Sequence, residues 1–464
     1  SAELLLIFFL ILSKIRDILI TVFVFFEQKM NIIRMIVHNM KQIDFLTKIE
    51  EVVFVYESLL EIFYKNRNEY NKICEERLSN DNVTFLPLEV KGKKTFYLLT
   101  KEVHNQMLSM YKMNAKVNKI LQQLPEVAVD HFCRRCLIDE IVLTNDIEGV
   151  VSTRKDIGDI LDKVPSENKE KNDRLSGLVD KYRKLQKKEK IPLSTCQDVR
   201  ELYNELFLNE VILSDSDNQP DGKYFRKDSV EVRTQTQKSI HTGLEPESKI
   251  IEAMQIVLDF INDDEYDLLI RTAICHYYIG YIHPFYDGNG RLSRFISSYL
   301  ITQEFAPVLA YRLSYTIKEN IKEYYEAFKT CNDPRNQGDL TPFVLMFLRV
   351  LKISMEQLIV GLEKRKGQLE YYETLLGNFA KSEEIKNEDV IKMLFVLVQS
   401  ELFSERGIST QELLEFLEIS RSTLKKIMES IQNYGLIKKM KRGTKNFFGI
   451  YLEELEKLVH ASSK

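Results

Sequence analysis

The sequence predicts a mainly α-helical protein with a short β-hairpin inserted into its helical body and a winged-helix module at its C-terminus. Three observations predict this fold class. Apolar residues recur with helical spacing over most of residues 101–375, whereas strand-like patterns are short and come in pairs. Near the C-terminus, two helical segments joined by a turn precede a strand–turn–strand pattern, which is typical of a winged helix.

The composition is that of an ordinary globular protein. The chain has 464 residues, of which 44% are apolar and 29% charged, with a net charge of −4. Any basic surface for nucleic acid must therefore be local. Six scattered cysteines indicate a reducing compartment, so a cytoplasmic protein is expected. The single C-x-x-C pair, Cys133 and Cys136, lacks the four ligands of structural zinc and is interpreted as ordinary helix positions.

Residues 1–40 form an apolar N-terminal segment whose status the sequence leaves open. Its two apolar runs, 4–12 and 18–26, are each shorter than the roughly 18–20 residues of a membrane span, and charges separate them. No small-residue cleavage site follows, as a signal peptide would require. A peripheral anchor, a buried helix, or a start upstream of the natural initiator remain open, so residues 1–29 are of uncertain origin. A membrane partner is not expected.

The elements that follow are expected in this order. Residues 41–140 are predicted to be an N-terminal helical region with a hairpin, because 83–90 and 95–99 are β-rich and flank a glycine-containing turn. Helical spacing begins at residue 101 and continues to about 141. The polar stretch 155–190 is interpreted as a solvated connector.

Residues 141–375 are predicted to be the core that carries the chemistry. Its expected helices cover residues 196–213, 248–261, 264–281 and 292–301, and further helices continue to about 375. Residues 222–242 contain a strand-like pattern and are interpreted as a hairpin inserted between helices. The polar stretch 381–387 is the predicted linker to a final domain at 385–464.

The segment 283–294, His-Pro-Phe-Tyr-Asp-Gly-Asn-Gly-Arg-Leu-Ser-Arg, carries the strongest functional signal. Gly288 and Gly290 allow the backbone to take positive φ angles and to approach a ligand closely. The helix that follows presents its free N–H groups, which form an anion-binding site. Arg291 and Arg294 are neighbours on that helix, and their guanidinium groups suit phosphate oxygens.

Two further residues of this segment supply the remaining parts of a transfer reaction. Asp287 is a hard oxygen ligand beside the predicted phosphate site, which is where Mg²⁺ would bind. His283 can take a proton from an attacking hydroxyl and return it later. Positioning, charge neutralisation and one base suffice for phosphoryl-type transfer, so the segment predicts that reaction class.

The same segment resembles the Fic family motif H-x-F-x-[D/E]-G-N-G-R-x-x-R at every fixed position, within a resemblance that covers about residues 100–375. The resemblance implies a Fic-type helical bundle with a β-hairpin flap. It also implies transfer of AMP from ATP, with Mg²⁺, to a Ser, Thr or Tyr hydroxyl of a protein. His283 would be the base, Asp287 the metal ligand and Asn289 the residue that holds the α-phosphate. The remaining nucleotide-binding residues would be Gly288, Gly290, Arg291 and Arg294.

The family resemblance assigns two more regions. The predicted hairpin, with Val230, Glu231, Val232 and Arg233, would be the flap that aligns a target segment by strand addition. Tyr325 and Asn332 resemble contacts from a helix that closes on the adenine; core packing and helix capping are the alternatives. One departure from the family pattern is Gly280, which stands where many members carry Glu.

Residues 144–149, Thr-Asn-Asp-Ile-Glu-Gly, resemble the inhibitory motif [S/T]-x-x-x-E-[G/N] of the family. This implies that Glu148, with Thr144 and Gly149, pairs with Arg294 and removes the guanidinium that should hold the γ-phosphate. The alternative is an exposed Glu at the end of a helix capped by glycine. Held near Mg²⁺, the same carboxylate could instead orient a water that removes AMP, so the chain is a candidate for both directions.

The C-terminal segment is predicted to be a winged helix with a local basic face. Residues 421–446 contain eight lysines and arginines against one acid, Glu429. Duplex DNA is therefore a candidate partner, and protein contacts or dimerisation are the alternative. The predicted DNA-contacting residues are Arg421, Ser422, Thr423, Lys426, Lys441 and Arg442.

Three functional hypotheses follow from these patterns. The first is an autoinhibited protein adenylyltransferase acting on a protein substrate, the chain itself included. The second is a nucleotide-responsive, DNA-binding transcription regulator whose transferase activity is weak or vestigial. The third keeps the fold but transfers a different group. The sequence does not identify the target protein, the modified residue or the oligomeric state, and a homo-oligomer remains a candidate assembly.

Overall fold

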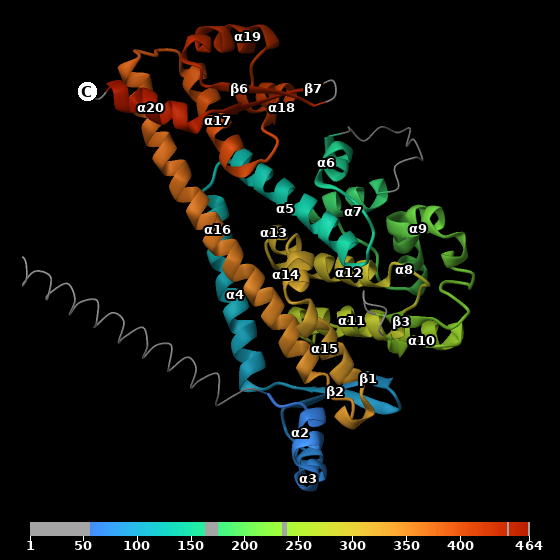
Figure 1. The fold of residues 1–464 in the computed structure, drawn as a ribbon. Helices are drawn as coiled ribbons and strands as arrows, with labels where there is room; N and C mark the ends of the chain where they lie inside the picture. The colour runs from blue at the N-terminus through green and yellow to red at the C-terminus, as the bar shows by residue number, and fades with distance from the viewer. Residues whose placement is uncertain (1–55, 163–174, 234–238, 443–444, 463–464) are drawn as a thin grey trace, which may run out of the picture. The chain divides into compact units, whose positions relative to one another are not determined.

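The computed structural model describes residues 56–162, 175–233, 239–442 and 445–462, and helices dominate its fold (Figure 1). All elements named below belong to one compact unit, Ser58–Lys464. The predicted mainly α-helical fold class is confirmed. The apolar N-terminal segment lies outside the described residues, so its three interpretations stay open. Within the described part of the chain, no helix combines the length and apolarity needed to cross a bilayer.

The N-terminal hairpin forms as predicted. Strands β1 (Val83–Val90) and β2 (Lys93–Leu98) pair antiparallel. Phe96 is fully buried, and its backbone N–H and C=O are hydrogen-bonded to the segment just before α16 (Thr341–Ser382). The hairpin is therefore attached to the longest helix. The two helices that precede it are α2 (Leu59–Lys65) and α3 (Arg67–Leu78).

The long helical stretch predicted from residue 101 is two helices, α4 (Lys101–Gln122) and α5 (Glu126–Ile147). Pro125 begins the second helix because proline cannot continue the first one. Helix α4 packs along α16, and α5 packs against α14 and against α17 (Glu388–Phe403) (Figure 1). Helix α5 thus connects the middle of the molecule to its C-terminal part.

The interpretation of residues 155–190 as a solvated connector is wrong for most of this stretch. Helices α6 (Arg154–Asp162) and α7 (Ser176–Gln186) occupy its two ends. Each helix has apolar residues at helical spacing that are buried, Ile157 in α6 and Tyr182 in α7 among them. The high charge content hid this spacing. The most polar part, residues 163–174, lies outside the described residues.

The predicted helix at 196–213 is present, but its middle is a π-helical turn, η1 (Asn204–Leu208). The predicted hairpin follows as β3 (Glu231–Arg233) and β4 (Ser239–Thr242), which pair antiparallel. The remaining elements of this region are α8 (Cys196–Tyr203), α9 (Asn209–Ser214), η2 (Ser216–Asn218) and α10 (Glu247–Ile261).

The core is centred on α11 (Leu268–Ile282) and α12 (Asn289–Glu304), which pack against each other. Nearly every residue of α11 is buried, because α10, α12 and α16 all contact it. A short loop joins α11 to α12, so a deeply buried helix pair positions that loop. The elements that follow are α13 (Pro307–Ala310), α14 (Leu313–Glu319), α15 (Ile321–Asn332) and η3 (Pro334–Asn336).

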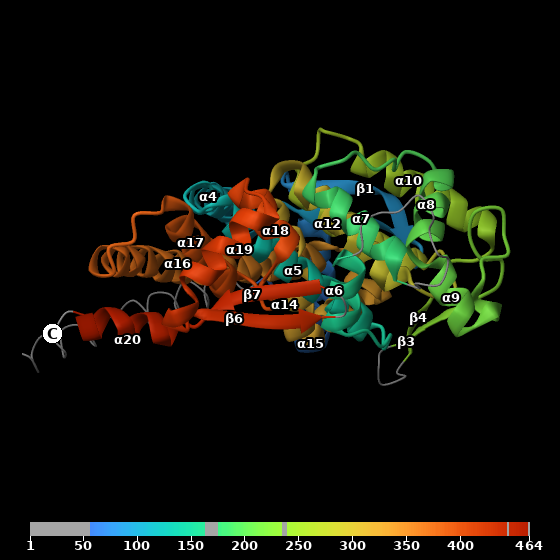
Figure 2. The ribbon, with the colours of Figure 1, turned by 90° about the horizontal axis from the view of Figure 1, so that it is seen from above.

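The C-terminal part contains the predicted helix–turn–helix, α18 (Thr410–Leu417) and α19 (Arg421–Ser430), followed by an antiparallel hairpin. Its strands, β6 and β7, lie side by side in Figure 2. The short strand β5 pairs with β7, so the three-stranded sheet has the order β5-β7-β6. The predicted linker corresponds to the turn between α16 and α17, within the same compact unit. The remaining elements are β5 (Ile408–Ser409), η4 (Gln432–Tyr434), β6 (Ile437–Arg442), β7 (Lys445–Ile450) and α20 (Leu452–Ser462).

The six cysteines are free thiols and all are buried. Cys133 and Cys136 lie in the middle of α5, as ordinary helix positions. Across the described ranges, no group of three or more His, Cys, Asp or Glu side chains is placed to hold a metal ion by itself.

Candidate functional site

The segment singled out in the sequence forms the loop between α11 and α12. His283 ends α11 in the left-handed conformation, with φ of 53°, and Gly288 precedes α12 with φ of 78°. Histidine is one of the few non-glycine residues that adopt this conformation with some frequency. The two left-handed positions reverse the chain direction within a few residues. As a result, the N-terminal N–H groups of α12 lie close to His283.

The shape of the loop is held by its own side chains. The Asn289 amide accepts a hydrogen bond from the Phe285 N–H at 2.9 Å and donates one to the Phe285 C=O at 2.8 Å. The Tyr203 ring stacks on the Phe285 ring at 3.7 Å, and its hydroxyl donates to the Asp287 C=O. Asn289 is buried, and both the oxygen and the nitrogen of its amide are hydrogen-bonded to the Phe285 backbone. Its contact with an α-phosphate stays a prediction.

His283 lines a cavity of about 170 Å³ between the loop, α5, α15 and the β3–β4 hairpin. Burial, with the nearby His241 and Arg226, lowers the pKa of His283 to about 3, so its ring is neutral at physiological pH. Its Nδ1 atom is buried and has no hydrogen-bond partner. A neutral imidazole that faces a cavity can accept a proton from a bound group.

Arg294 is almost completely buried, and its guanidinium group contacts residues at the C-terminal end of α5. Its Nε donates to Thr144 Oγ1 at 2.8 Å and its Nη2 to the Thr144 C=O at 3.0 Å. The same Nη2 lies 2.6 Å from Glu148 Oε1. Burial by itself would lower the pKa of Arg294. The Glu148 carboxylate beside it acts in the opposite direction, and the pKa of Arg294 lies above its ordinary value. The structure thus brings together Thr144, Glu148 and Arg294, which the sequence proposed as a group.

The Glu148 carboxylate lies directly on the first turn of α12. A Cβ atom at Gly290 would lie 2.2 Å from Glu148 Oε1, so the carboxylate in this position packs directly against the glycine. Glu148 ends α5, and Gly149 follows with a positive φ of 76°, as in a glycine-capped helix. Because a helix N-terminus attracts anions, the carboxylate occupies the position that suits a phosphate group.

Arg291 is bound by a residue that the sequence analysis did not identify. Its Nη1 lies 2.6 Å from Glu210 Oε2, and both side chains are at most 4% exposed. Its guanidinium carbon lies 5.0 Å from the centre of the Phe207 ring. Its Nε and Nη2 atoms have no hydrogen-bond partner, which leaves two donors for another acceptor. No local signal in the sequence pointed to Glu210, because it lies in a different helix.

The Asp287 carboxylate is partly exposed at the rim of the loop. Its Oδ1 accepts the Gly288 N–H, and its Oδ2 lies 3.7 Å from Arg291 Nη2. One accessible carboxylate next to a phosphate site fits Mg²⁺, which usually takes one or two carboxylates and completes its shell with phosphate oxygens and water. Asp287 would have to share the ion with a bound phosphate group.

The β3–β4 hairpin covers the cavity on one side. Val230 and Glu231 line it, whereas the side chains of Val232 and Arg233 lie outside the described residues. Arg226 fastens the base of the hairpin, because its buried guanidinium donates to the C=O groups of His283 at 2.8 Å, Asp228 at 2.6 Å and Leu244 at 2.8 Å.

Of the two predicted adenine contacts, Tyr325 lines the cavity and Asn332 does not. Asn332 is buried; its Oδ1 accepts from the Tyr277 hydroxyl at 2.7 Å, and its amide nitrogen lies 3.4 Å from His241 Nδ1. His241 in turn donates from Nε2 to the Tyr281 C=O. Asn332 therefore supports the hairpin strand that carries His241, and its adenine contact stays a prediction.

Residues 193–301 match the model of the Fic/DOC family. This central segment of the chain is therefore similar to the Fic/DOC family. The matched residues include the whole loop, from His283 to Arg294, and the hairpin. They do not include Glu148, Tyr325 or the C-terminal part of the chain.

Two curated relatives of the chain are protein adenylyltransferases of nematodes. The chain is 31% identical over 130 residues to protein adenylyltransferase fic-1 of Caenorhabditis elegans, a match that covers 27% of this chain and 23% of that protein. It is 29% identical over 140 residues to the fic-1 of Caenorhabditis briggsae, a match that covers 29% of this chain and 25% of that protein. The chain thus spans about a quarter of the length of these relatives.

Two solved structures resemble the chain at low identity. A Fic family protein from Desulfovibrio desulfuricans G20 aligns with a TM-score of 0.46 and 18% identity, over 77% of this chain and 98% of that chain. Fic-1 of C. elegans aligns with a TM-score of 0.41 and 19% identity, over 66% and 81%.

Gly280, in the last turn of α11, is closely packed. A Cβ atom at Gly280 would lie 2.7 Å from the Phe328 ring, so any side chain here would displace that ring. Both residues line the same cavity. Phe328 therefore fills the space that a side chain at position 280 would otherwise need.

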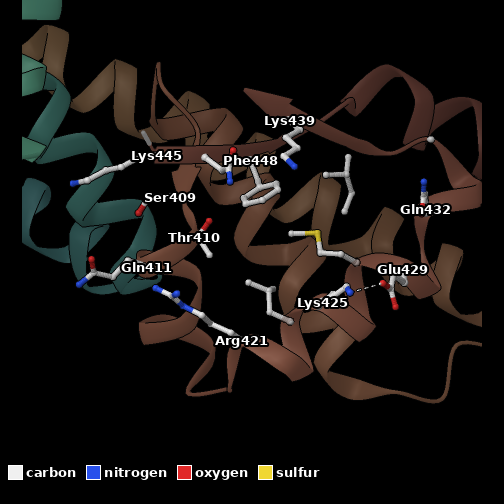
Figure 3. Close-up of a pocket in the computed structure, with 15 residues that line it drawn as sticks. Ser409, Thr410, Gln411, Arg421, Lys425, Glu429, Gln432, Lys439, Lys445 and Phe448 are labelled. Carbon is white, nitrogen blue, oxygen red and sulfur yellow. Dashed lines mark ion pairs between the residues drawn. The ribbon is translucent and has the colours of Figure 1, made fainter. Parts of the chain in front are cut away.

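A second hollow, of about 780 Å³, lies between α19 and the β6–β7 hairpin (Figure 3). Arg421 and Lys425 line it from α19, and Lys439 and Lys445 from the sheet (Figure 3). Its floor is apolar and includes Phe448. Four cationic side chains on opposite sides of one groove form a surface that attracts phosphate groups.

The predicted DNA-contacting residues divide between this groove and its surroundings. Arg421 lines the groove, while Ser422 and Lys426 are exposed elsewhere on α19. Thr423 is half-buried, and its N–H donates to Ser420 Oγ at the start of the helix. The two hairpin residues, Lys441 and Arg442, are exposed at the end of β6 but do not line the groove.

Proposed function

We propose that the chain is a protein adenylyltransferase that moves AMP from ATP to a hydroxyl group of a protein. One observation carries this proposal: His283, the N-terminus of α12 and the buried Arg294 all border the same cavity. The related adenylyltransferases support the same reaction class, although they match only the central part of the chain.

The transfer requires one bond to form and one to break at the α-phosphorus. The oxygen of the target hydroxyl attacks this atom, and His283 takes the hydroxyl proton, because its neutral ring can accept one. The bond from the α-phosphorus to the bridging oxygen breaks, and pyrophosphate leaves. Arg291 and the α12 N–H groups hold the β- and γ-phosphates. Mg²⁺, when bound at Asp287, would neutralise charge on the phosphates.

Glu148 acts as an internal brake in this proposal. Its carboxylate binds Arg294 at 2.6 Å and covers the first turn of α12. A γ-phosphate would compete with the carboxylate for the same guanidinium and the same N–H groups. The triphosphate would then bind in a shifted position, and a shift of about 1 Å can cost ~100-fold in rate. The cavity of about 170 Å³ is smaller than typical ligand sites of ~300–1,000 Å³, as expected for a blocked site.

We extend the proposal to the reverse reaction, in which the Glu148 carboxylate helps to remove AMP from a modified protein. Glu148 borders the cavity together with His283. It could take a proton from a water molecule whose oxygen bonds to the phosphorus of an AMP-modified target. The bond from phosphorus to the target oxygen then breaks, AMP leaves, and the water proton passes by way of Glu148 and His283 to the target oxygen. This hypothesis requires hydrolysis of a modified protein to depend on Glu148, and it fails if a Glu148→Gln variant removes AMP as fast as the wild type.

The decisive experiment is mass spectrometry of the Glu148→Gly variant after incubation with Mg-ATP and a cell lysate. A gain of one AMP on a lysate protein or on the chain itself would identify both reaction and target. Substitution of His283 by Ala in the same variant should abolish the gain. Equal labelling with and without His283 would refute the mechanism, and a different mass gain would indicate another transferred group.

We propose duplex DNA as a second partner, through the groove between α19 and the hairpin. The support is the four cationic side chains that line it, against the single acid Glu429. Because phosphate contacts release counterions, the affinity should fall steeply with salt. A gel-shift with the full chain tests this, and an affinity that is absent or insensitive to salt would instead favour a protein partner.

A further inference from the structure

A separate cavity of about 210 Å³ lies where the C-terminal part of the chain meets α5 and α6. Residues from four segments line it: His131 and Arg134 from α5, Lys155 from α6, Arg406 from the turn after α17, and Arg442 from the end of β6. None of these segments belongs to the loop around His283. The cavity is therefore distinct from the proposed transferase site.

The lining of this cavity is unusually cationic. Six lysines and arginines border it, against three carboxylates. Asp162 already serves two of the arginines, because its Oδ1 lies 2.7 Å from Arg134 and 2.6 Å from Arg406. Burial, and next the nearby Arg406, lower the pKa of Arg134 to about 10. Arg135 and Arg154 share Glu405, and Arg406 also pairs with Glu412. The lining residues themselves still carry more positive than negative charge.

Several buried nitrogen atoms around the cavity lack a partner. His131 is 4% exposed, and neither Nδ1 nor Nε2 makes a hydrogen bond. The Nε atoms of Arg134 and Arg406 are also buried and without a partner. Burying a polar group without a hydrogen bond is costly, so such groups are usually paired with another group or with a ligand. An anion with several acceptor oxygens would satisfy donors of this kind.

We propose that this cavity is a binding site for a small phosphate-type oxyanion, with pyrophosphate as the representative ligand. Its volume is below the ~300–1,000 Å³ of sites for drug-sized ligands, so a compact anion fits better than a whole nucleotide. Arginine guanidinium groups pair well with phosphate oxygens. Lys155 and Arg442 would bind at the exposed rim, where both side chains are accessible.

The position of the site connects it to the proposed brake. His131 and Arg134 lie on α5, the helix whose last residue is followed by Glu148. Arg406 and Arg442 belong to the C-terminal part, and an anion between the two groups would fasten α5 to that part. The site itself does not depend on the transferase proposal, because its binding can be measured without any turnover.

Isothermal titration of the full-length chain with inorganic pyrophosphate, at about 0.15 M salt, tests the site. Lys155→Gln and Arg442→Gln should each weaken binding about five-fold, because each removes one charge-assisted contact at the rim. Asp159→Asn should strengthen binding about three-fold, because it removes a repelling carboxylate from the lining. Lys364→Gln is the matched control, since Lys364 is an exposed lysine of α16 outside the cavity.

Pyrophosphate could also bind at the loop around Arg294, and the variants separate the two sites. If all three cavity variants bind pyrophosphate as tightly as the wild type and the Lys364→Gln control, the cavity is not the site and the proposal is wrong. Absence of wild-type binding at millimolar pyrophosphate overturns it as well. If Lys155→Gln weakens binding of a DNA duplex but not of pyrophosphate, the cavity contacts a nucleic-acid backbone instead, which also contradicts the proposal.

Discussion

Two of the phosphate-attracting surfaces proposed for this chain, the loop between α11 and α12 and the groove beside α19, are built in opposite ways. At the loop between α11 and α12, Arg291 and Arg294 are each 1% exposed, and each is bound to a carboxylate, of Glu210 and Glu148 respectively. In the C-terminal part, Arg421 and its cationic neighbours on α19 and the hairpin are largely exposed to solvent.

This difference teaches what each surface can recognise. A buried guanidinium cannot remain unpaired, so it is held in one orientation and binds a ligand of one geometry. Exposed lysines keep their mobility and are screened by salt, so they attract any phosphate backbone with little specificity. The four predictions below test this contrast, from the largest expected effect to the smallest.

The largest effect is expected from breaking the buried pair of Arg291 and Glu210. Glu210→Gln should lower the free energy of unfolding by about 3 kcal/mol, because it leaves a buried charge without its partner. Urea unfolding of the full chain measures this. The matched control is Glu429→Gln, which removes the exposed pair with Lys425 and should change stability by less than about 0.5 kcal/mol. If both substitutions change the free energy of unfolding by the same amount, the proposed contrast between the buried and the exposed ion pairs is wrong.

Next in size is the effect of releasing Arg294. Glu148→Gly should raise the rate of AMP transfer about 100-fold, which corresponds to ~2.7 kcal/mol in the activation barrier. Glu148→Gln should give a smaller increase, since its amide can still contact Arg294 without the charge. The rate of labelling with α-labelled ATP measures both. Glu326→Gln on the exposed face of α15 is the control, and an unchanged rate in Glu148→Gly contradicts the brake.

A third test concerns Glu140, which lies two turns before Glu148 on α5. Burial raises the pKa of Glu140 to about 7, although its carboxylate accepts two hydrogen bonds from Ser314. The unfolded chain loses this proton near its ordinary value of 4.5, before the folded chain does. The stability that Glu140 contributes is thus present below about pH 4.5 and is lost as the pH rises through 7.

Replacing Glu140 should therefore flatten the pH dependence of stability. Between pH 5 and 8, the decrease in the free energy of unfolding should be about 2 kcal/mol smaller in Glu140→Gln than in the wild type. Glu415→Gln, at an exposed position of α18, should keep the wild-type slope. If wild type and Glu140→Gln lose the same stability between pH 5 and 8, the pKa of Glu140 is not raised in the folded chain and the prediction is wrong.

The smallest effect is expected in the C-terminal part. Lys441→Gln should weaken duplex DNA binding two- to five-fold, and should reduce the slope of log affinity against log salt by about one. AMP transfer should not change. Gel-shift titrations at several salt concentrations measure the slope, with Lys364→Gln on α16 as the control. A loss that does not depend on salt would indicate a protein-type interface.

Most helices and all three hairpins could be predicted from the sequence, because periodic apolar residues and glycine turns are local signals. The stretch 155–190 is an exception: a solvated connector was predicted, because its many charged residues hid the helical spacing of the buried apolar residues in α6 and α7. The role of Asn289 was also beyond sequence reasoning: the same amide can bind a phosphate or clasp the Phe285 backbone, and only the loop geometry shows the clasp.

The sequence by itself determined the likeness of residues 193–301 to the Fic/DOC family, because the loop motif places its glycines, acid and arginines within twelve consecutive residues of one turn and one helix. The tertiary structure decided what holds each arginine. Glu148 and Arg294 are 146 residues apart in the chain, and Glu210 and Arg291 are 81 apart. Such pairs meet only when several helices pack around a common core, and no local pattern encodes which distant carboxylate that packing brings to a buried charge.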